Sequence, residues 1–290
     1  MHLITTVKSM LVFNKQNDLK AHLKANISAT IGFVPTMGAL HQGHLSLMEE
    51  SMRNNDLTIV SIFVNPTQFN NSEDLAKYPR SLEADIEKIK TVSDDIIIYA
   101  PSAQDIYNGA VVSQHFDFGG LERQLEGKFR PGHFDGVGTV VKLLLEIVGP
   151  TSAYFGEKDF QQLQIIKKMV AQFNLPVKII GCPIYREANG LAMSSRNERL
   201  TAAERDNAAF IYQSLKFAAD SFKDNHTALT ISDEIEKKFE KHPEFKLEYF
   251  QIAAEDTLDP CFIKHKNVKY RAFIAVFVNK IRLIDTISLN

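Results

Sequence analysis

The stretch Pro35-Thr36-Met37-Gly38-Ala39-Leu40-His41-Gln42-Gly43-His44 decides the expected fold of this chain. It follows an apolar, β-branched run at 30–34 and precedes the apolar, periodic residues Leu45, Leu47 and Met48. This order predicts a strand, a tight glycine turn and a helix. A glycine turn that opens a helix gathers unpaired backbone N–H groups at the positive end of the helix dipole. The stretch therefore indicates a site for an anion, above all for phosphate.

Two histidines in this stretch, His41 and His44, are three residues apart and would share one face of the predicted helix. Gly43 between them leaves room for a ligand to approach the backbone. Ordinary surface histidines and a metal site are the alternatives. However, the sequence has no H-E-x-x-H motif, and Cys182 and Cys261 stand alone without C-x-x-C spacing. The pattern favours two imidazoles directed at a nucleotide triphosphate.

The composition of the 290 residues limits the classes of function. Lysine and arginine number 33, aspartate and glutamate 35, and no dense basic block occurs, so we expect neither nucleic acid nor a membrane as partner. Two cysteines argue against a disulfide framework and fit a reducing compartment. The sequence shows no signal peptide and no apolar run of about 18 residues. We therefore expect a soluble cytoplasmic protein.

Strand-like and helix-like segments alternate through the first two thirds of the chain. Strands are predicted at 31–35, 57–64, 95–100, 152–155 and 177–180, with helical patterns at 43–54, 82–89 and 137–148 between them. This alternation predicts an α/β fold with a Rossmann-like, doubly wound parallel sheet. Ligands of such sheets bind beyond the carboxyl ends of the strands, where the motifs of this chain lie.

The pattern changes after about Tyr185. Thr201 and Glu204 form a capping box, which is expected to open a helix with the apolar positions Ala208, Ile211, Leu215, Ala218 and Phe222. A second helix carries Ile231, Ile235 and Phe239 at i, i+4 and i+8. Three strand-like runs follow, at 247–253, 270–278 and 281–289, with a tight turn at 279–280 between the last two. We therefore expect a Rossmann-like domain at 1–185 and a smaller α+β domain at 186–290.

Four further segments carry polar groups after predicted strands: 65–69, 127–138, 156–162 and 186–197. The amides of Asn65 and Gln68 could bind hydroxyl and carboxylate groups, although exposed turn amides are an equal alternative. The glycine-rich segment 127–138 is expected to be a loop that enters a helix. It contains Lys128 and Arg130 but has no Walker A pattern.

The other two segments combine cations with polar groups. Lys158 and Gln162 would share a helix face, with a surface salt bridge at the helix start as the alternative. Ser194, Ser195 and Arg196 could clamp phosphate oxygens. A serine nucleophile is disfavoured because no G-x-S-x-G elbow surrounds either serine. The Asn-Gly turn at 189–190 would let this segment move as a lid.

In this order and at these spacings, the motifs resemble those of the pantoate–β-alanine ligases, or pantothenate synthetases. The segments that carry the resemblance are P-T-M-G-A-L-H-Q-G-H, N-P-T-Q-F, Y-P-R at 78–80, R-P-G-H-F at 130–134, G-E-K-D-F-Q-Q and R-E-x-x-G-L-A-M-S-S-R-N. The likeness runs from about residue 25 to the C-terminus. H-x-G-H alone is shared by the wider nucleotidyltransferase superfamily. This family usually has Asp where the chain has Asn189, which changes the charge of that turn.

The resemblance implies an ATP-dependent condensation of (R)-pantoate with β-alanine. The pantoate carboxylate would attack the α-phosphate of ATP and release pyrophosphate. The amine of β-alanine would then attack the pantoyl-adenylate and give pantothenate and AMP. The resemblance further implies Mg²⁺ as cofactor, a cytoplasmic homodimer, an ATP- and pantoate-binding domain at 1–185 and a lid at 186–290.

The resemblance also assigns roles to single residues. The catalytic set would be His44 as proton donor, with His41, Lys158, Ser194, Ser195 and Arg196. The ATP-binding set would be Met37, Gly38, Ala39, Leu40, His41, Gln42, Gly43, His44, Gly156, Glu157, Lys158, Asp159, the backbone of Tyr185, Met193, Ser194, Ser195 and Arg196. The set for pantoate and β-alanine would be Gln68, Gln162, Asn65, Tyr78 and Arg130, and Asp85 would hold Mg²⁺.

Two other functions compete with this one. Another nucleotidyltransferase would share H-x-G-H but would need cations for a substrate phosphate, where this chain offers Gln68 and Gln162. A nucleotide sensor on the same fold would bind ATP without turnover and would tolerate the loss of His44.

Overall fold

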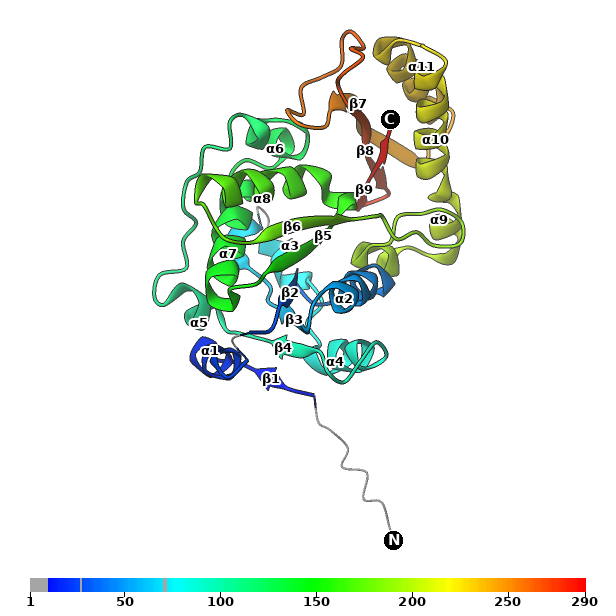
Figure 1. Ribbon diagram of the computed structural model, residues 1–290. Helices are drawn as coiled ribbons and strands as arrows, with labels where there is room; N and C mark the ends of the chain where they lie inside the picture. Colours follow the sequence, from blue (N-terminus) through cyan, green and yellow to red (C-terminus); the bar gives the residue numbers. More distant parts are fainter. Residues whose placement is uncertain (1–9, 27, 70–71) are drawn as a thin grey trace. The chain divides into compact units, whose positions relative to one another are not determined.

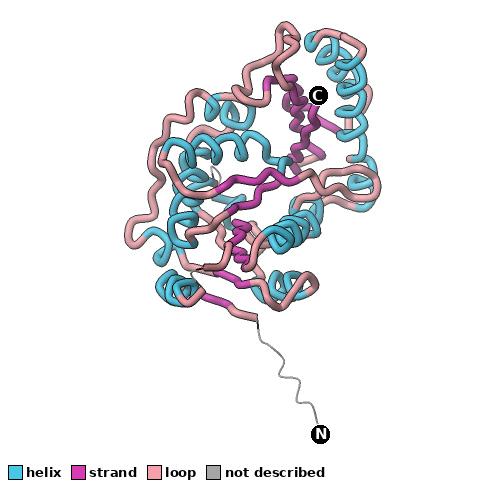
Figure 2. The backbone as a smooth tube through the Cα atoms, viewed as in Figure 1, coloured by secondary structure: helices cyan, strands magenta, loops and turns pink. Residues whose placement is uncertain are grey.

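A computed structural model describes residues 10–26, 28–69 and 72–290, which form two compact units. Unit 1 comprises the described residues up to Phe116, together with 132–155 and 166–182. Unit 2 comprises 117–131, 156–165 and 183–290. The strands form two separate sheets, coloured magenta in Figure 2. The two-domain boundary near Tyr185 stays a prediction, and we describe each unit by itself.

Unit 1 is built on a six-stranded sheet with the order β1-β4-β3-β2-β5-β6. The neighbours β1 and β4, β4 and β3, β3 and β2, and β2 and β5 run parallel. Helices α2 and α4 lie on one side of the strands, and α1 and α7 lie on the other (Figure 1). Val34, Val60 and Ile98, from three adjacent strands, are fully buried beneath α2 and α4. The expected parallel α/β sheet of the Rossmann-like class is confirmed.

All predicted strands of unit 1 form, whereas the strand β1 and the helices α1, α3 and α5 have no counterpart among the predicted elements. The strands are β1 (Val12–Phe13), β2 (Ile31–Thr36), β3 (Leu57–Ile62), β4 (Ile97–Tyr99), β5 (Ser152–Gly156) and β6 (Lys178–Cys182). The helices are α1 (Gln16–Lys24), α2 (Gln42–Asn54), α3 (Ser72–Lys77), α4 (Leu82–Lys90), α5 (Ala103–Tyr107) and α7 (His133–Val148). A short 3₁₀ helix spans Pro66–Gln68, and α8 (Phe160–Gln172) contributes its second half.

The glycine-rich segment 127–138 differs from its expected form, because most of it is helical. It contains the end of α6 (Leu125–Phe129) and the start of α7, which begins after Gly132 with its φ of +76°. Gly136 lies inside α7, and a Cβ atom there would lie 2.6 Å from the carbonyl oxygen of Thr67. This glycine therefore permits close approach of two backbones rather than loop mobility.

Unit 2 contains the three-stranded antiparallel sheet β7-β8-β9, formed by β7 (Phe245–Ala254), β8 (Tyr270–Val278) and β9 (Ile281–Ser288). Its helices are α6, the first half of α8, α9 (Ala202–Asn207), α10 (Ala209–Lys223) and α11 (Ala228–Glu240). Short 3₁₀ helices span Leu121–Arg123, Glu157–Asp159 and Ser195–Arg199. The expected capping box is present, because Thr201 N donates to Glu204 Oε2 and Glu204 N donates to Thr201 Oγ1. The turn expected at 279–280 joins β8 to β9.

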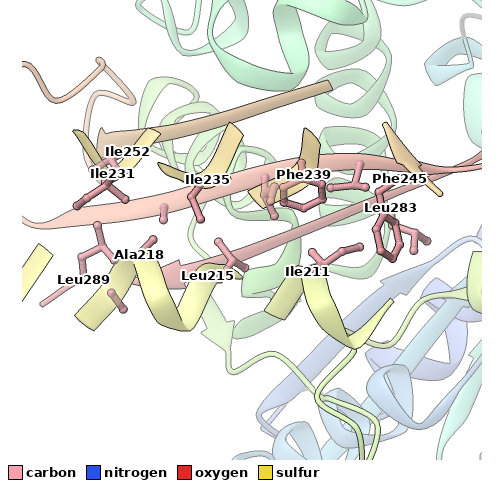
Figure 3. Close-up of a cluster of buried hydrophobic side chains, with 14 of the residues drawn as sticks. Ile211, Leu215, Ala218, Ile231, Ile235, Phe239, Phe245, Ile252, Leu283 and Leu289 are labelled. Atoms are coloured by element: carbon pink, nitrogen blue, oxygen red, sulfur yellow. The ribbon is translucent and has the colours of Figure 1, made fainter. Parts of the chain in front are cut away.

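The core of unit 2 lies between its sheet and the helices α10 and α11. Figure 3 shows Ile211 and Leu215 from α10 and Ile231 and Ile235 from α11 packed against side chains of the strands. These apolar positions recur every three or four residues along each helix, so each helix presents one continuous apolar face. No described helix of the whole chain has the length and apolar character needed to cross a membrane.

We predict that Ile235→Ala destabilises the protein by about 2–5 kcal/mol, because Ile235 is fully buried and the substitution leaves a cavity. The matched control is Leu229→Ala on the same helix, where the side chain is 73% exposed and the effect should stay within about 0.5 kcal/mol. Urea unfolding monitored by circular dichroism measures both. Equal destabilisation by the two substitutions would contradict the described core.

Candidate active site

The loop between β2 and α2 carries the H-x-G-H motif at the carboxyl end of a central strand of unit 1. Its backbone is left-handed at Gly38 and Ala39, with φ values of +79° and +49°. Gly38 N donates to Thr36 Oγ1 at 3.2 Å, and Thr36 Oγ1 donates to Ser61 O at 2.8 Å in the adjacent strand. The loop is thus anchored to the sheet at its first residues, as the sequence predicted for a tight turn between strand and helix.

The two histidines occupy the first turn of α2, where His41 is the N-cap residue. Their ring centroids lie 4.0 Å apart, with an angle of 31° between the ring planes. His41 N donates a hydrogen bond to His44 Nδ1 at 3.3 Å. Because Nδ1 accepts this bond, neutral His44 carries its proton on Nε2. The fold therefore presents a defined N–H donor at the start of the helix.

Gln68 lies at the end of the 3₁₀ helix that follows β3, where its neighbours fix its position. Asn65 Nδ2 donates to Gln68 Oε1 at 3.2 Å and to Gly136 O at 3.1 Å, and Asn65 itself is only 1% exposed. The backbone oxygen of Gln68 lies 2.8 Å from His133 Nδ1. The Gln68 amide nitrogen points at the sulfur of Met37, a weak acceptor. This amide can therefore exchange a weak partner for a stronger one, such as a carboxylate.

Asp85 on α4 does not fit the expected metal site. Its side chain is 3% exposed, and its two carboxylate oxygens accept hydrogen bonds from Ala39 N at 3.0 Å and Leu40 N at 2.7 Å. Among the described residues, no group of three or more histidine, cysteine or acidic side chains is arranged to hold a metal ion. Mg²⁺ takes six ligands in octahedral geometry, so among the described residues it would need oxygens of substrate or water to complete its shell.

A cavity of about 620 Å³ lies within unit 1 beside this loop. Its lining comes from residues that follow β2, β3 and β4 and from the start of α4, and includes Met37, Gly38, Val64, Arg80, Asp85 and Pro101. Tyr78, near the same end of α4, packs its ring edge-on against Phe69 at 5.7 Å. The cavity thus occupies the edge of the sheet where ligands of parallel α/β proteins bind.

In unit 2, the segment with Lys158 is fixed by a buried arginine of β8. Arg271 is 5% exposed and pairs with Glu157 at 3.1 Å and Glu255 at 3.0 Å, and its guanidinium lies 4.0 Å from the centre of the Phe160 ring. Lys158 Nζ lies 3.5 Å from Asp159 Oδ2. Lys158 belongs to a 3₁₀ helix, and α8 begins only at Phe160, so the expected shared face of one α-helix with Gln162 does not form as such.

The neighbouring residues Gln161 and Gln162 differ in their surroundings. Gln161 is 4% exposed, accepts from Glu126 N at 2.9 Å, and donates to Leu121 O and Gln124 O, both at 2.8 Å. Gln161 thus fastens the segment 117–131 within unit 2. Gln162 is half-buried, and its amide makes no side-chain hydrogen bond to other described residues. Of the two glutamines, Gln162 is the one able to bind a substrate.

The segment 186–197 is held by a buried ion pair between Arg186 and Asp285 of β9. Two nitrogens of Arg186 donate to the two carboxylate oxygens at 2.6 and 3.0 Å, and its guanidinium stacks on Tyr212 at 3.7 Å. Burial raises the pKa of Asp285, whereas Arg186 and, to a smaller extent, Lys158 oppose this rise. Gly190 has a φ of +95°, and a Cβ there would lie 2.6 Å from Tyr212. Arg186 also donates to Gly190 O at 3.1 Å, so the ion pair between Arg186 and Asp285 helps to fix the backbone of this turn.

A second anchor lies directly beside the M-S-S-R motif. Glu187 accepts two hydrogen bonds from Arg205, at 2.7 and 2.9 Å, and one from Asn197 Nδ2 at 2.7 Å. Asn197 is 1% exposed and also donates to Ala192 O. Ser194 Oγ accepts from Arg196 N at 3.3 Å and begins the 3₁₀ helix. These bonds hold both ends of the segment 193–196.

Asn189, where the resembled family usually has Asp, uses both ends of its amide. Its Oδ1 accepts from Leu191 N at 3.0 Å, a bond that a carboxylate could also make. Its Nδ2 donates to Arg205 O at 3.1 Å, which a carboxylate could not do. The amide thus ties the turn to α9, a contact available only to the residue found in this chain. The adjacent Tyr185 O accepts from Met193 N at 3.0 Å.

Three arginines and a glutamate surround the end of α6 in unit 2. Glu126 pairs with Arg282 through two bonds of 2.7 and 2.8 Å and accepts from the Tyr249 hydroxyl at 2.7 Å. Burial lowers the pKa of Arg130. Glu126 opposes this change, whereas the nearby guanidiniums of Arg196 and Arg282 lower the pKa further. The charge of Asp159, like that of Glu126, opposes the effect of these neighbouring cations.

The structure thus distributes the expected site residues over both units. His41, His44, Gln68 and Asp85 belong to unit 1, and Arg130, Lys158, Gln162 and Arg196 belong to unit 2. The sequence did not reveal the supporting residues Gln161, Glu187, Arg271 and Asp285. Arg271 and Asp285 stand as single charges within the apolar strands β8 and β9, whereas no local pattern marks Gln161 or Glu187 as a support.

The six-stranded parallel sheet and the loop after β2 define an α/β protein of the Rossmann-like class. A sequence model of the family described as pantoate-beta-alanine ligase matches residues 11–288. The pantothenate synthetase of Flavobacterium psychrophilum is 62% identical over 282 residues, which cover 97% of this chain and all of that protein. The chain belongs to the pantoate-beta-alanine ligase family.

Solved structures agree with this assignment. The pantothenate synthetase of Thermus thermophilus superimposes with a TM-score of 0.89 at 36% identity, covering 97% of this chain and 99% of that one. The pantoate-beta-alanine ligase of Francisella tularensis, solved as a complex with beta-gamma ATP and beta-alanine, gives a TM-score of 0.79 at 37% identity and covers 97% of this chain and 98% of that one.

Proposed function

We propose that this enzyme condenses (R)-pantoate with β-alanine through a pantoyl-adenylate, consuming ATP and releasing AMP and pyrophosphate. The family match over residues 11–288 carries the proposal, and the Francisella relative bound to an ATP analogue and β-alanine supports the choice of substrates. The chain needs no nucleophilic side chain for this reaction, because the pantoate carboxylate and the β-alanine amine are the nucleophiles.

His44 is proposed as the proton donor to the phosphates of ATP. Support comes from the hydrogen bond between His41 N and His44 Nδ1, which leaves Nε2–H as the donor. The resemblance assigns the loop 37–44, the segment 156–159, the Tyr185 backbone and the segment 193–196 to the same nucleotide. Lys158 and Arg196 would neutralise the charge that develops as pyrophosphate leaves, with Ser194 and Ser195 donating to phosphate oxygens.

Gln68 and Gln162 are proposed to orient pantoate, with Gln68 also near β-alanine. Neutral amides can hold the pantoate carboxylate without lowering its nucleophilicity as a cation would, and correct orientation alone can remove several kcal/mol from a barrier. Asn65, Tyr78 and Arg130 complete the proposed substrate set. Mg²⁺ is included as the counter-ion of ATP, held by phosphate oxygens and water.

We predict that AMP forms only when ATP, pantoate and β-alanine are all present, and that ATP and pantoate suffice for one enzyme equivalent of pyrophosphate. A coupled assay for AMP and pyrophosphate measures both. ATP binding without turnover under these conditions would favour a nucleotide sensor. Pyrophosphate release that is independent of pantoate would favour another nucleotidyltransferase.

We predict that His44→Asn lowers the rate of adenylate formation by about 100-fold or more, because asparagine keeps an acceptor near the Nδ1 position but loses the Nε2 donor. His44→Gln, which places an N–H near Nε2, should retain more activity. The control is His226→Ala, which removes an exposed histidine. Single-turnover pyrophosphate release gives the rates. A near-wild-type rate in folded His44→Asn would exclude this role.

The proposal includes a cytoplasmic homodimer in which residues 186–290 act as a lid. These features rest on the family resemblance. Analytical sedimentation at micromolar concentration should give about twice the chain mass of 32.7 kDa, and a single species at that chain mass would contradict the dimer.

A further inference from the structure

Helix α4 holds the peptide groups of the H-x-G-H loop through two charged side chains. Asp85 accepts one hydrogen bond on each carboxylate oxygen, from the successive nitrogens Ala39 N and Leu40 N. One turn further along α4, Lys88 Nζ donates to Leu40 O at 2.6 Å. The backbone of Leu40 is therefore bound at its N–H by an anion and at its carbonyl by a cation.

The loop needs such support because its conformation is unfavourable on its own. Ala39 is a non-glycine residue with a φ of +49°, a region that most side chains avoid. Two successive left-handed residues turn the following N–H groups toward one point, which forms a small anion-binding nest. The carboxylate of Asp85 fills that nest in the structure. A Cβ at Gly38 would lie 2.8 Å from Asp85 Oδ2, so the carboxylate also occupies the space that only glycine leaves open.

We propose that Asp85 and Lys88 are positioning residues, which hold the loop so that His41 and His44 meet ATP in a fixed arrangement. Asp85 then acts through the loop backbone and is not a ligand of Mg²⁺. Its burial, its two backbone hydrogen bonds and the missing metal-binding cluster among the described residues all agree with this role. The inference rests on the proposed function, because the affinity for ATP is the quantity used to detect a change in the loop.

The decisive experiment distinguishes loop positioning from metal binding by substituting the anionic Asp85 and the cationic Lys88 in separate variants. Isothermal titration calorimetry measures ATP binding in the presence of EDTA, and pyrophosphate release is measured across a Mg²⁺ titration. Asp85→Asn puts an amide N–H against a backbone N–H. Lys88→Met removes the donor to Leu40 O and alters no residue able to bind a metal. The matched control is Lys90→Met, on the exposed side of the same helix, where the lysine pairs with Glu87.

We expect Asp85→Asn and Lys88→Met each to weaken metal-free ATP binding by about 10- to 100-fold, as for loss of a charge-assisted hydrogen bond. The Mg²⁺ concentration for half-maximal rate should stay within about twofold of wild type. Lys88→Arg, which keeps a donor, should restore most of the affinity, and Lys90→Met should change nothing. If Asp85→Asn does not fold, as judged by circular dichroism, the two Lys88 variants carry the test.

Three outcomes decide against parts of this scheme. A normal metal-free ATP affinity for Asp85→Asn, with at least a tenfold increase in the Mg²⁺ requirement, would make Asp85 a metal ligand and overturn the inference. An unchanged affinity for Lys88→Met would overturn it as well. Failure of the wild-type protein to bind ATP would instead contradict the proposed function.

Discussion

A charge removed from water needs a partner, and this constraint determines the course of the functional loops in each unit. In unit 1, two loop N–H groups donate to the buried carboxylate of Asp85. In unit 2, Asp285 of β9 requires Arg186, and Arg271 of β8 requires Glu157 and Glu255. All of these partners except Glu255 lie on a segment that carries candidate site residues. The loops are therefore positioned by the electrostatic needs of the scaffold rather than by their own conformational preferences.

Much of the fold could be predicted because its signals are local. The apolar runs and the capping box at Thr201 and Glu204 lie within single segments, and they mark β2, β3, β8 and the start of α9 to within a few residues. The single helix expected from the capping box onward is instead two helices, α9 and α10, which meet at Ala208. In the glycine-rich segment 127–138, the expected entry into a helix is present as the start of α7, but the expected loop before it includes the end of α6. Glycine also occurs where backbones touch, and the contact of Gly136 with Thr67 joins residues far apart in the sequence. No local pattern distinguishes that contact from a flexible loop.

The candidate site divides in a similar way. Residues in recognisable motifs, such as His44, Gln68 and Arg196, could be named from the sequence, although their roles remain proposals. The residues that hold these side chains in place could not be named from the sequence. Gln161 and Gln162 illustrate the difficulty, because they are identical in type and adjacent in sequence. Only the structure shows that one fastens a loop through three hydrogen bonds while the other keeps its amide available. Asp85 is of a residue type that often binds metals, but in the structure its two carboxylate oxygens accept hydrogen bonds from backbone N–H groups.

The bond between His41 N and His44 Nδ1 places an imidazole at the third residue of α2, where the capping box of other helices uses a glutamate or glutamine side chain. The ring proposed to act on ATP therefore also satisfies a backbone N–H at the helix start, and this hydrogen bond restrains it without any ligand. Binding then costs little side-chain entropy at this position, since the rotamer has been selected during folding. Folding therefore already restricts a side-chain conformation that substrate binding would otherwise have to restrict.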